Sequence, residues 1–140
     1  MPTLEQIEAK REARKAQAET DRKAQLAIDL EAIDALECEY GDSNVAMVEV
    51  TYLPGLPVLV ACRTPKGPEI KRYRDRVKDK GNGKSGDPIA AAIELAAVCR
   101  VYPPKEAYDL ILEARPGIDT QIGVEALKLA SGKAASEGKG

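Results

Sequence analysis

Two proline-containing corners limit the C-terminal part of this chain to short helices. Pro103-Pro104 ends one apolar segment, and Pro116-Gly117 ends the next one shortly afterwards. Proline cannot donate a main-chain hydrogen bond and clashes with the preceding helical turn, whereas glycine is favoured just past the end of a helix. The stretch between the corners therefore predicts one short amphipathic helix over 105–114. The neighbouring helices must fold back on it, so that their alanine-rich faces pack closely.

The N-terminal part behaves differently, because residues 3–39 favour one long helix. Thr3, with Gln6 three positions later, forms a capping-box pattern at the helix start. Alanine is the only apolar residue type over residues 8–25, so this half is expected to be solvated and held by charge pairs. Larger apolar residues follow at helical spacing and give the second half a face that can dock. Two interpretations stay open: a solvated helix with a frayed start, or a helix for oligomerisation or partner binding.

Two segments after this helix predict a β-hairpin. Residues 45–52 alternate apolar and polar side chains, as expected of a strand with one solvated face. Residues 58–63 are more apolar and predict a more buried strand. Pro54-Gly55 between them suits a turn that needs a positive φ at its second central residue. Because an isolated hairpin is only marginally stable in water, helices must cover its apolar face.

The remaining chain predicts a small helical bundle. A basic helix is expected over 69–80, and the next one starts at Asp87-Pro88, where aspartate is the N-cap and proline occupies the first helical position. After the 105–114 helix, Asp119 or Thr120 is expected to cap a last helix over roughly 120–130. The predicted fold class is α+β, mostly α, with a long N-terminal helix, one β-hairpin and about four short helices. The chain is predicted to divide into a charged helix over 1–40, a compact domain over 41–132 and a disordered tail over 133–140.

Composition argues against catalysis. The chain has no histidine, tryptophan or phenylalanine, and only 4% of its residues are aromatic, so its core must be built from valine, isoleucine, leucine and alanine. A nucleophile needs an activating base, and without histidine only lysine, a carboxylate or a metal remains. No pair of carboxylates stands apart from ordinary surface charge. We therefore expect neither enzyme activity nor a cofactor.

The cysteines do not predict a metal site. Cys38, Cys62 and Cys99 are widely spaced, and no histidine is present to complete a zinc site. Cys62 and Cys99 fall in apolar segments and are expected to be buried in a reducing compartment. No apolar run reaches the roughly 18 residues of a membrane span, and the N-terminus lacks the apolar core of a secretory signal. A cytoplasmic location without a membrane partner is therefore expected.

Positive charge is concentrated in residues 63–84, which contain nine bases and three acids. Such a stripe can contact a phosphate backbone or an acidic protein surface, or can be an ordinary solvated helix face. The glycine-rich segment 81–86 lacks the first glycine of a phosphate-binding loop, because Lys78 occupies that position, and a helix precedes it rather than a strand. The helical part of the stripe forms a predicted basic patch: Lys71, Arg72, Arg74, Arg76 and Lys78.

The order of features over residues 62–132 carries a family resemblance. A strand ending in Arg63 leads to the basic segment EIKRYRDRV, a polar loop and an alanine-rich helix ending in CRVYP. The segment AYDLILEARPGI and a last helix ending in LKLASG follow. This order is similar to that of the tail assembly chaperones of long-tailed bacteriophages. The resemblance implies a small, non-catalytic helical protein of the bacterial cytoplasm, which binds the tape-measure protein and keeps it soluble until the tail tube polymerises around it.

Two apolar helix faces are the predicted partner-binding surfaces, because an amphipathic client helix can dock on such faces. The expected partner is the tape-measure protein or another phage tail protein, and a homo-oligomer is also compatible. Two other functions stay open: a nucleic-acid-binding module that uses the 63–84 stripe, and a small structural component of the phage virion. The predicted partner-binding residues are Leu26, Leu30, Ile33, Leu36, Ile122 and Leu129.

Overall fold

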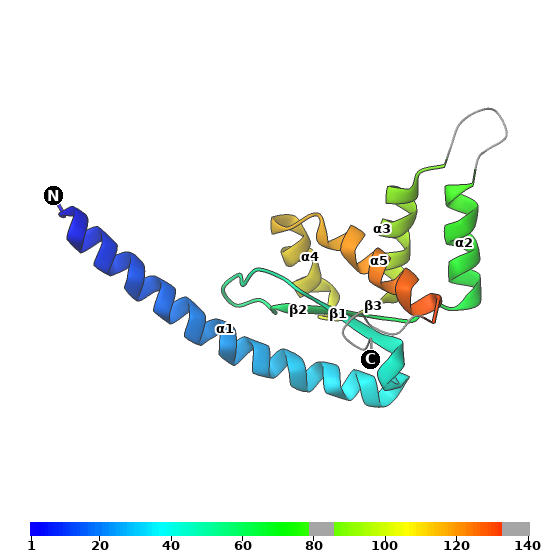
Figure 1. The fold of residues 1–140 in the computed structure, drawn as a ribbon, viewed down its shortest axis with the longest axis horizontal. Helices are drawn as coiled ribbons and strands as arrows, with labels where there is room; N and C mark the ends of the chain where they lie inside the picture. The colour runs from blue at the N-terminus through cyan, green and yellow to red at the C-terminus, as the bar shows by residue number, and fades with distance from the viewer. Residues whose placement is uncertain (79–85, 133–140) are drawn as a thin grey trace.

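The computed structural model describes residues 1–78 and 86–132 of the 140-residue chain (Figure 1). These residues confirm the predicted class: a mostly helical α+β fold with a long N-terminal helix and one β-hairpin, followed by four short helices. Most of the predicted glycine-rich linker and the whole predicted tail lie outside the described residues. The elements are α1 (Leu4–Tyr40), a 3-10 turn (Asp42–Asn44), β1 (Val45–Glu49), β2 (Leu59–Arg63), α2 (Gly67–Val77), α3 (Pro88–Cys99), β3 (Arg100–Tyr102), α4 (Lys105–Ala114) and α5 (Ile118–Ala130).

Helix α1 is the longest element, and its first half projects away from the rest of the molecule (Figure 1). The predicted capping box is present, since Thr3 and Gln6 exchange hydrogen bonds between side chain and main chain. Residues 4–21 are exposed throughout, whereas the second half of the helix packs under the sheet. The helix ends at Gly41, whose positive φ of 99° suits glycine.

The sheet is antiparallel in the order β1-β2-β3. The predicted hairpin is confirmed, with Met47 opposite Ala61 at its centre and Gly55 at a positive φ of 79° in the turn. The short strand β3 was not predicted. Pro103 restricts the residue before it to extended backbone, so the chain leaves α3 at Cys99 and pairs along the free side of β2 before the proline corner.

The central strand β2 is buried on both faces, and its side chains divide the interior into two cores. Val60 and Cys62 face α3, α4 and α5, where the larger cluster lies. Leu59 and Ala61 face the opposite way, toward α1. The small side chains allow close helix packing: a Cβ atom on Gly123 of α5 would lie 2.4 Å from the main-chain oxygen of Ala92 in α3.

A buried carboxylate joins α1 to the sheet. The Asp29 side chain accepts hydrogen bonds from the main-chain N–H groups of Val58, at 2.7 Å, and Leu59, at 3.2 Å, at the start of β2. It also accepts from the hydroxyl of Tyr102 in β3, at 2.5 Å, and from the Gln25 side chain one helical turn earlier. Burial, with this carboxylate beside it, raises the pKa of the Tyr102 hydroxyl, which therefore remains a donor. One residue of α1 is thus bonded to both neighbouring strands.

A second tyrosine–aspartate pair corrects the predicted start of α5. The helix begins at Ile118 after Gly117, so neither Asp119 nor Thr120 is its N-cap. Asp119 is instead buried and accepts a hydrogen bond from the hydroxyl of Tyr108 in α4. The side chain that resembles a cap in the sequence therefore connects the last two helices.

Replacing the buried anchor should destabilise the whole fold. We predict that Asp29→Ala lowers the free energy of unfolding by at least about 3 kcal/mol, because two buried amides and one hydroxyl lose their acceptor at about 1–3 kcal/mol each. The free energy is measured by urea denaturation followed by circular dichroism. Asp34→Ala, at an exposed position on the same helix, is the matched control and should change the free energy by no more than about 0.5 kcal/mol. Equal effects of the two substitutions would contradict the prediction.

Candidate interaction surface

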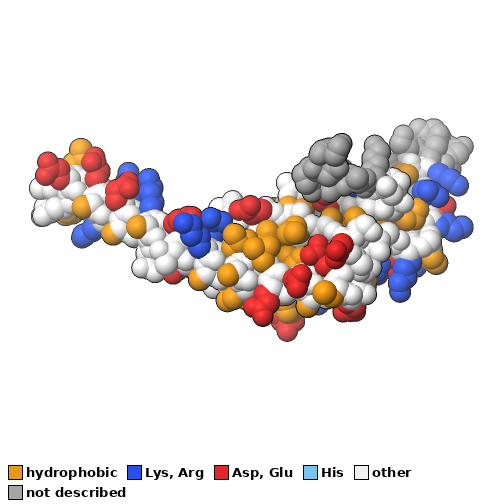
Figure 2. All heavy atoms as spheres, turned by 60° about the horizontal axis from the view of Figure 1, so that its bottom comes forward, with side chains coloured by type: hydrophobic (Ala, Val, Ile, Leu, Met, Phe, Trp, Pro, Cys, Tyr) orange, Lys and Arg blue, Asp and Glu red, His pale blue; other side chains and the backbone are white. Residues whose placement is uncertain are grey.

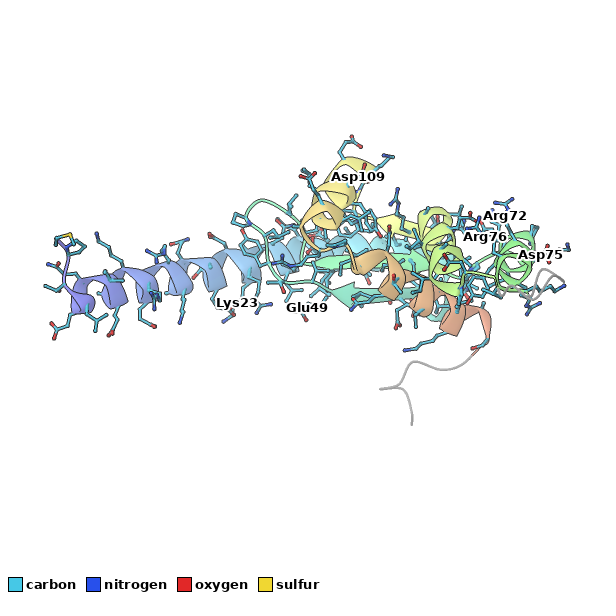
Figure 3. The ribbon with its side chains drawn as sticks, turned by 90° about the horizontal axis from the view of Figure 1, so that it is seen from above. Lys23, Glu49, Arg72, Asp75, Arg76 and Asp109 are labelled. Carbon is cyan, nitrogen blue, oxygen red and sulfur yellow. The ribbon has the colours of Figure 1, made fainter. Side chains whose placement is uncertain are left out.

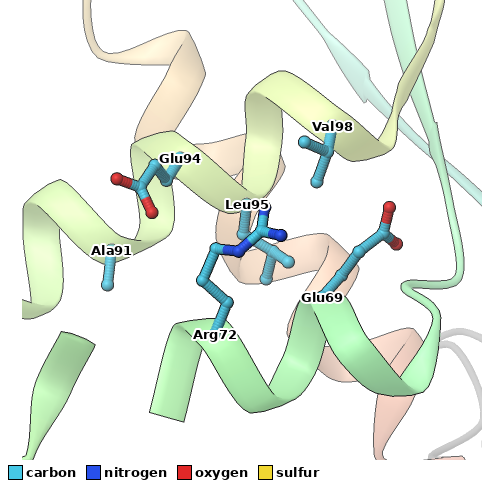
Figure 4. A pocket seen from close by; sticks show the side chains of 6 residues that line it. All are labelled: Glu69, Arg72, Ala91, Glu94, Leu95 and Val98. Atoms are coloured by element: carbon cyan, nitrogen blue, oxygen red, sulfur yellow. The ribbon is translucent and has the colours of Figure 1, made fainter. Parts of the chain in front are cut away.

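Helices α2 and α3 lie side by side and frame a shallow groove of about 210 Å³ (Figures 1 and 4). Its floor is apolar, and charged side chains from both helices form its rim. In Figure 4 the Arg72 side chain extends from α2 toward α3, between the two glutamates that it labels. The lining residues are Glu69, Arg72, Ala91, Glu94, Leu95 and Val98.

The start of α2 is fixed by an ion pair between Arg63 and Glu69. The guanidinium of Arg63, at the end of β2, donates two hydrogen bonds of 2.9 Å to the Glu69 carboxylate. Glu69 also accepts from the main-chain N–H of Lys66, at 2.7 Å, which completes the first turn of the helix. Arg63 donates a further bond of 2.8 Å to the main-chain oxygen of Val98 in α3. A single arginine therefore positions both walls of the groove.

The charges of the groove are balanced at its two ends. The hydrogen bonds from Arg63 lower the pKa of Glu69 to about 2. At the other end, Arg76 of α2 forms a 2.8 Å ion pair with Glu94 of α3. Arg72, between these pairs, forms no ion pair within the described part of the chain and leaves a positive charge on the rim.

The ion pair at Glu69 should make stability depend on pH in the acid range. Its pKa is lower in the folded chain than its ordinary value of 4.5, so the folded state binds fewer protons than the unfolded state. The stabilisation is present above the ordinary pKa and is lost as the pH falls toward 2. We predict that Glu69→Gln lowers the free energy of unfolding at pH 7 by about 1–3 kcal/mol and flattens its dependence on pH between 5 and 2.

Denaturant titrations at a series of pH values test this prediction. Glu106→Gln, at an exposed position in α4, is the control and should leave the wild-type profile unchanged. A Glu69→Gln variant with the full wild-type loss of stability in acid would contradict the role of this ion pair.

An exposed apolar ridge lies on the side of α3 that faces away from the groove. Ile89 and Ile93 are one helical turn apart and are 62% and 40% exposed, and Val98 at the groove wall is also 40% exposed. The apolar composition of α3 suggests a helix that is buried on all sides, but these exposed side chains show that one side of it is open to solvent. Its opposite side, with Leu95 and Ala96, packs in the core. Sequence reasoning missed the ridge because apolar residues surround this helix and leave no periodicity to mark an outer side.

The predicted basic patch is on and just after α2, but opposite charges interrupt it. Lys71 and Lys78 both contact Asp75, at 3.4 and 3.8 Å, and Arg76 pairs with Glu94. Figure 3 shows Arg72, Asp75 and Arg76 together at the end of the molecule farthest from the N-terminal arm. Of the five predicted residues, Arg72 and Arg74 form no ion pair within residues 1–78 and 86–132. The patch is thus a helix surface of alternating charge.

The predicted partner-binding residues do not form one surface. Ile33 and Ile122 are a correction: they are 1% and 0% exposed, because each fills one of the chain's own two cores. Leu26, Leu36 and Leu129 are half-buried. Only Leu30 of this set is exposed, at 46%. The helical spacing correctly indicated packing faces, but it could not distinguish the chain's own sheet from a partner.

A second hollow of about 320 Å³ lies between β1 and α5. Its apolar members are Val48, which lies on the helix side of the sheet, and Val124, which is 42% exposed. The sequence gives little indication of this hollow, because no polar motif marks the residues that line it. The lining residues are Val48, Thr120, Gln121, Val124 and Glu125.

The cysteines lie as predicted, with two of them in the interior. Burial raises the pKa of Cys62 to about 12 and that of Cys99 to about 11, so both remain thiols, whereas Cys38 is exposed. No three cysteine or acidic side chains among the described residues are placed to hold a metal ion. In the same residues, none of the helices has the length and apolar content needed to cross a bilayer.

Comparison with known proteins gives a likeness of fold. No family model matches the sequence, and no curated protein matches it significantly. The structure is similar to that of an uncharacterised protein from Bacillus stearothermophilus, with a TM-score of 0.50 and 21% sequence identity. The match covers 74% of this chain and 95% of the Bacillus protein. At this level of identity the similarity shows a shared fold.

Proposed function

We propose that this protein is a phage tail assembly chaperone, which binds the tape-measure protein and keeps it soluble in the host cytoplasm during tail assembly. The observation that carries the proposal is the α2–α3 groove with its apolar floor, together with the exposed ridge of Ile89 and Ile93 on another side of α3. Both belong to the part of the chain, residues 62–132, whose order of features resembles that family.

The shape and chemistry of this surface suit an amphipathic helix as client. Helix-in-groove binding needs apolar contacts spaced by one helical turn, and Ile89 and Ile93 supply one such pair on α3. Val98 adds an exposed apolar contact on a different side of the helix, at the groove. The positive charge of Arg72 and the carboxylate of Glu94 at the rim can orient a client with charges of both signs. A shallow groove tolerates many client segments, as a chaperone for a long helical protein requires.

The charge pattern of α2 favours a protein client over nucleic acid. Binding to a phosphate backbone depends on several free bases acting together. Lys71, Arg76 and Lys78 each contact a carboxylate in the structure, so nucleic acid would have to displace these pairs. The mixed charges instead keep an apolar binding surface soluble.

Co-expression with the tape-measure protein encoded in the same genome tests the proposal. We predict that the wild-type chain raises the soluble fraction of the tape-measure protein several-fold, whereas Ile89→Lys/Ile93→Lys abolishes most of this gain. These substitutions place charge on the client surface at positions that are already exposed. Leu110→Lys, at a 54% exposed position on α4 outside the groove, is the matched control and should behave as wild type.

Two results would overturn the proposed function. The first is a tape-measure protein that is equally insoluble with and without this chain. The second is a shift of DNA mobility by the purified chain that weakens steeply with added salt, which would favour the nucleic-acid-binding alternative.

A further inference from the structure

Among the residues that the structure describes, Arg72 is the cation of the α2–α3 groove that no carboxylate neutralises. The two glutamates beside it are already paired: Glu69 accepts two hydrogen bonds of 2.9 Å from Arg63. Glu94 forms the 2.8 Å ion pair with Arg76. Figure 4 shows the Arg72 guanidinium directed across the groove toward α3, between these two glutamates. The groove therefore holds one positive charge that its own acids leave uncompensated.

The surroundings of the groove add to this positive charge. Residues 66–78, which contain α2, carry six bases and two acids, and α3 contributes one acid, Glu94. Figure 2 shows basic side chains at the end of the molecule where α2 lies, while acidic ones border the middle of the same face. A surface with an excess of one sign attracts partners of the opposite sign and repels others. An acidic segment is therefore favoured here over a neutral or basic one.

The volume of the groove limits what can enter it. At about 210 Å³ it is smaller than the roughly 300–1,000 Å³ of sites that enclose a small molecule. Its floor is formed by Ala91 and Leu95, with the more exposed Val98 beside them. An apolar hollow of this size suits an aliphatic side chain that protrudes from a helix lying across α2 and α3.

We propose that the groove recognises an acidic, amphipathic helical segment of the client. An aliphatic side chain of the segment enters the hollow, and an aspartate or glutamate one helical turn away pairs with Arg72. Side chains three or four residues apart lie on the same side of a helix, so one turn of the client supplies both contacts. The inference rests on the proposed function, because it names the kind of client segment that the same groove selects.

The chemistry of arginine makes this contact directional. A guanidinium can donate two parallel hydrogen bonds to one carboxylate, which fixes the orientation of the client as well as its position. A client lysine or arginine would meet Arg72 with the same charge. To reach either groove glutamate, it would have to displace the Arg63 or the Arg76 side chain. Specificity needs such a repulsive element besides the attractive one, so Arg72 is the specificity-determining residue of the groove.

A charge reversal with a matched control tests the pairing. The probes are fluorescein-labelled segments of about 25 residues, long enough to form a helix, which together cover the tape-measure protein encoded in the same genome. The Kd for the full chain is measured by fluorescence anisotropy at about 0.1 M salt. Arg72→Glu should raise the Kd of the bound segments about tenfold, whereas Arg74→Glu should change it less than about twofold.

Arg74 is a close control because it differs from Arg72 mainly in direction. Both side chains are exposed on α2 and form no ion pair within the described residues. Residues two apart on a helix do not share a side, so Arg74 does not line the groove. The two variants therefore have the same net charge and the same helix propensity.

Reversing a charge on the client shows whether Arg72 touches it directly. Each aspartate or glutamate of the tightest-binding segment is changed to lysine in turn. One of these changes should raise the Kd for the wild type about tenfold and lower it for Arg72→Glu, so that the two changes together restore most of the affinity. A merely structural role of Arg72 cannot produce this rescue. If Arg72→Glu does not fold, as judged by circular dichroism, Arg72→Gln should still raise the Kd about threefold.

The contrary outcomes separate this inference from the proposed function. Equal effects of Arg72→Glu and Arg74→Glu, bound segments without a carboxylate, or a lack of rescue overturn the inference and leave the chaperone proposal in place. If no segment binds although co-expression still raises the solubility of the tape-measure protein, the client binds elsewhere and the inference alone falls. If co-expression also fails, both fall. A dimer of the chain that Arg72→Glu dissociates in sedimentation equilibrium would place a second copy in the groove and also overturn the inference.

Discussion

The carboxylate of Asp29 determines where the long helix lies. Without it, α1 would be a charged helix with a weak apolar stripe and no defined register on the sheet. The carboxylate oxygens of Asp29 accept hydrogen bonds from the N–H groups of Val58 and Leu59 at the start of β2 and from the Tyr102 hydroxyl on β3. These donors satisfy a buried charge that would otherwise be costly. Because a carboxylate has directional lone pairs, the contact fixes both the height and the rotation of α1, which apolar packing by Ile33 alone would leave loosely specified.

The scarcity of aromatic side chains, which are all tyrosines, explains the close packing of the other layer. Alanine and glycine contribute little buried area, so stability requires backbones that approach closely enough for many small contacts. Gly123 against Ala92 shows this directly. Tyr108 is the exception: it is fully buried, bonded to Asp119 and covered by the Arg100 guanidinium at 4.2 Å from its ring. One tyrosine thus provides the specific contact that the alanine-rich helices lack.

Local signals in the sequence predicted the elements well, whereas long-range contacts were beyond them. Capping at Thr3, the turn at Gly55 and the N-cap at Asp87 act over three or four residues, so they can be read directly. Strand β3 and the buried role of Asp119 depend on partners far along the chain, and neither residue type nor spacing indicates those partners. The candidate surface shows the same limit: α3 was recognised as apolar, but only the placement of α2 and α5 decides which of its sides remains exposed.

The position of α1 under the sheet also explains why two different surfaces stay open. Asp29 holds the helix against one face of the sheet, beneath β2, so α1 leaves the outer edge of β1 open and Met47 exposed. The groove is framed by α2 and α3, and its lining shares no residue with that edge.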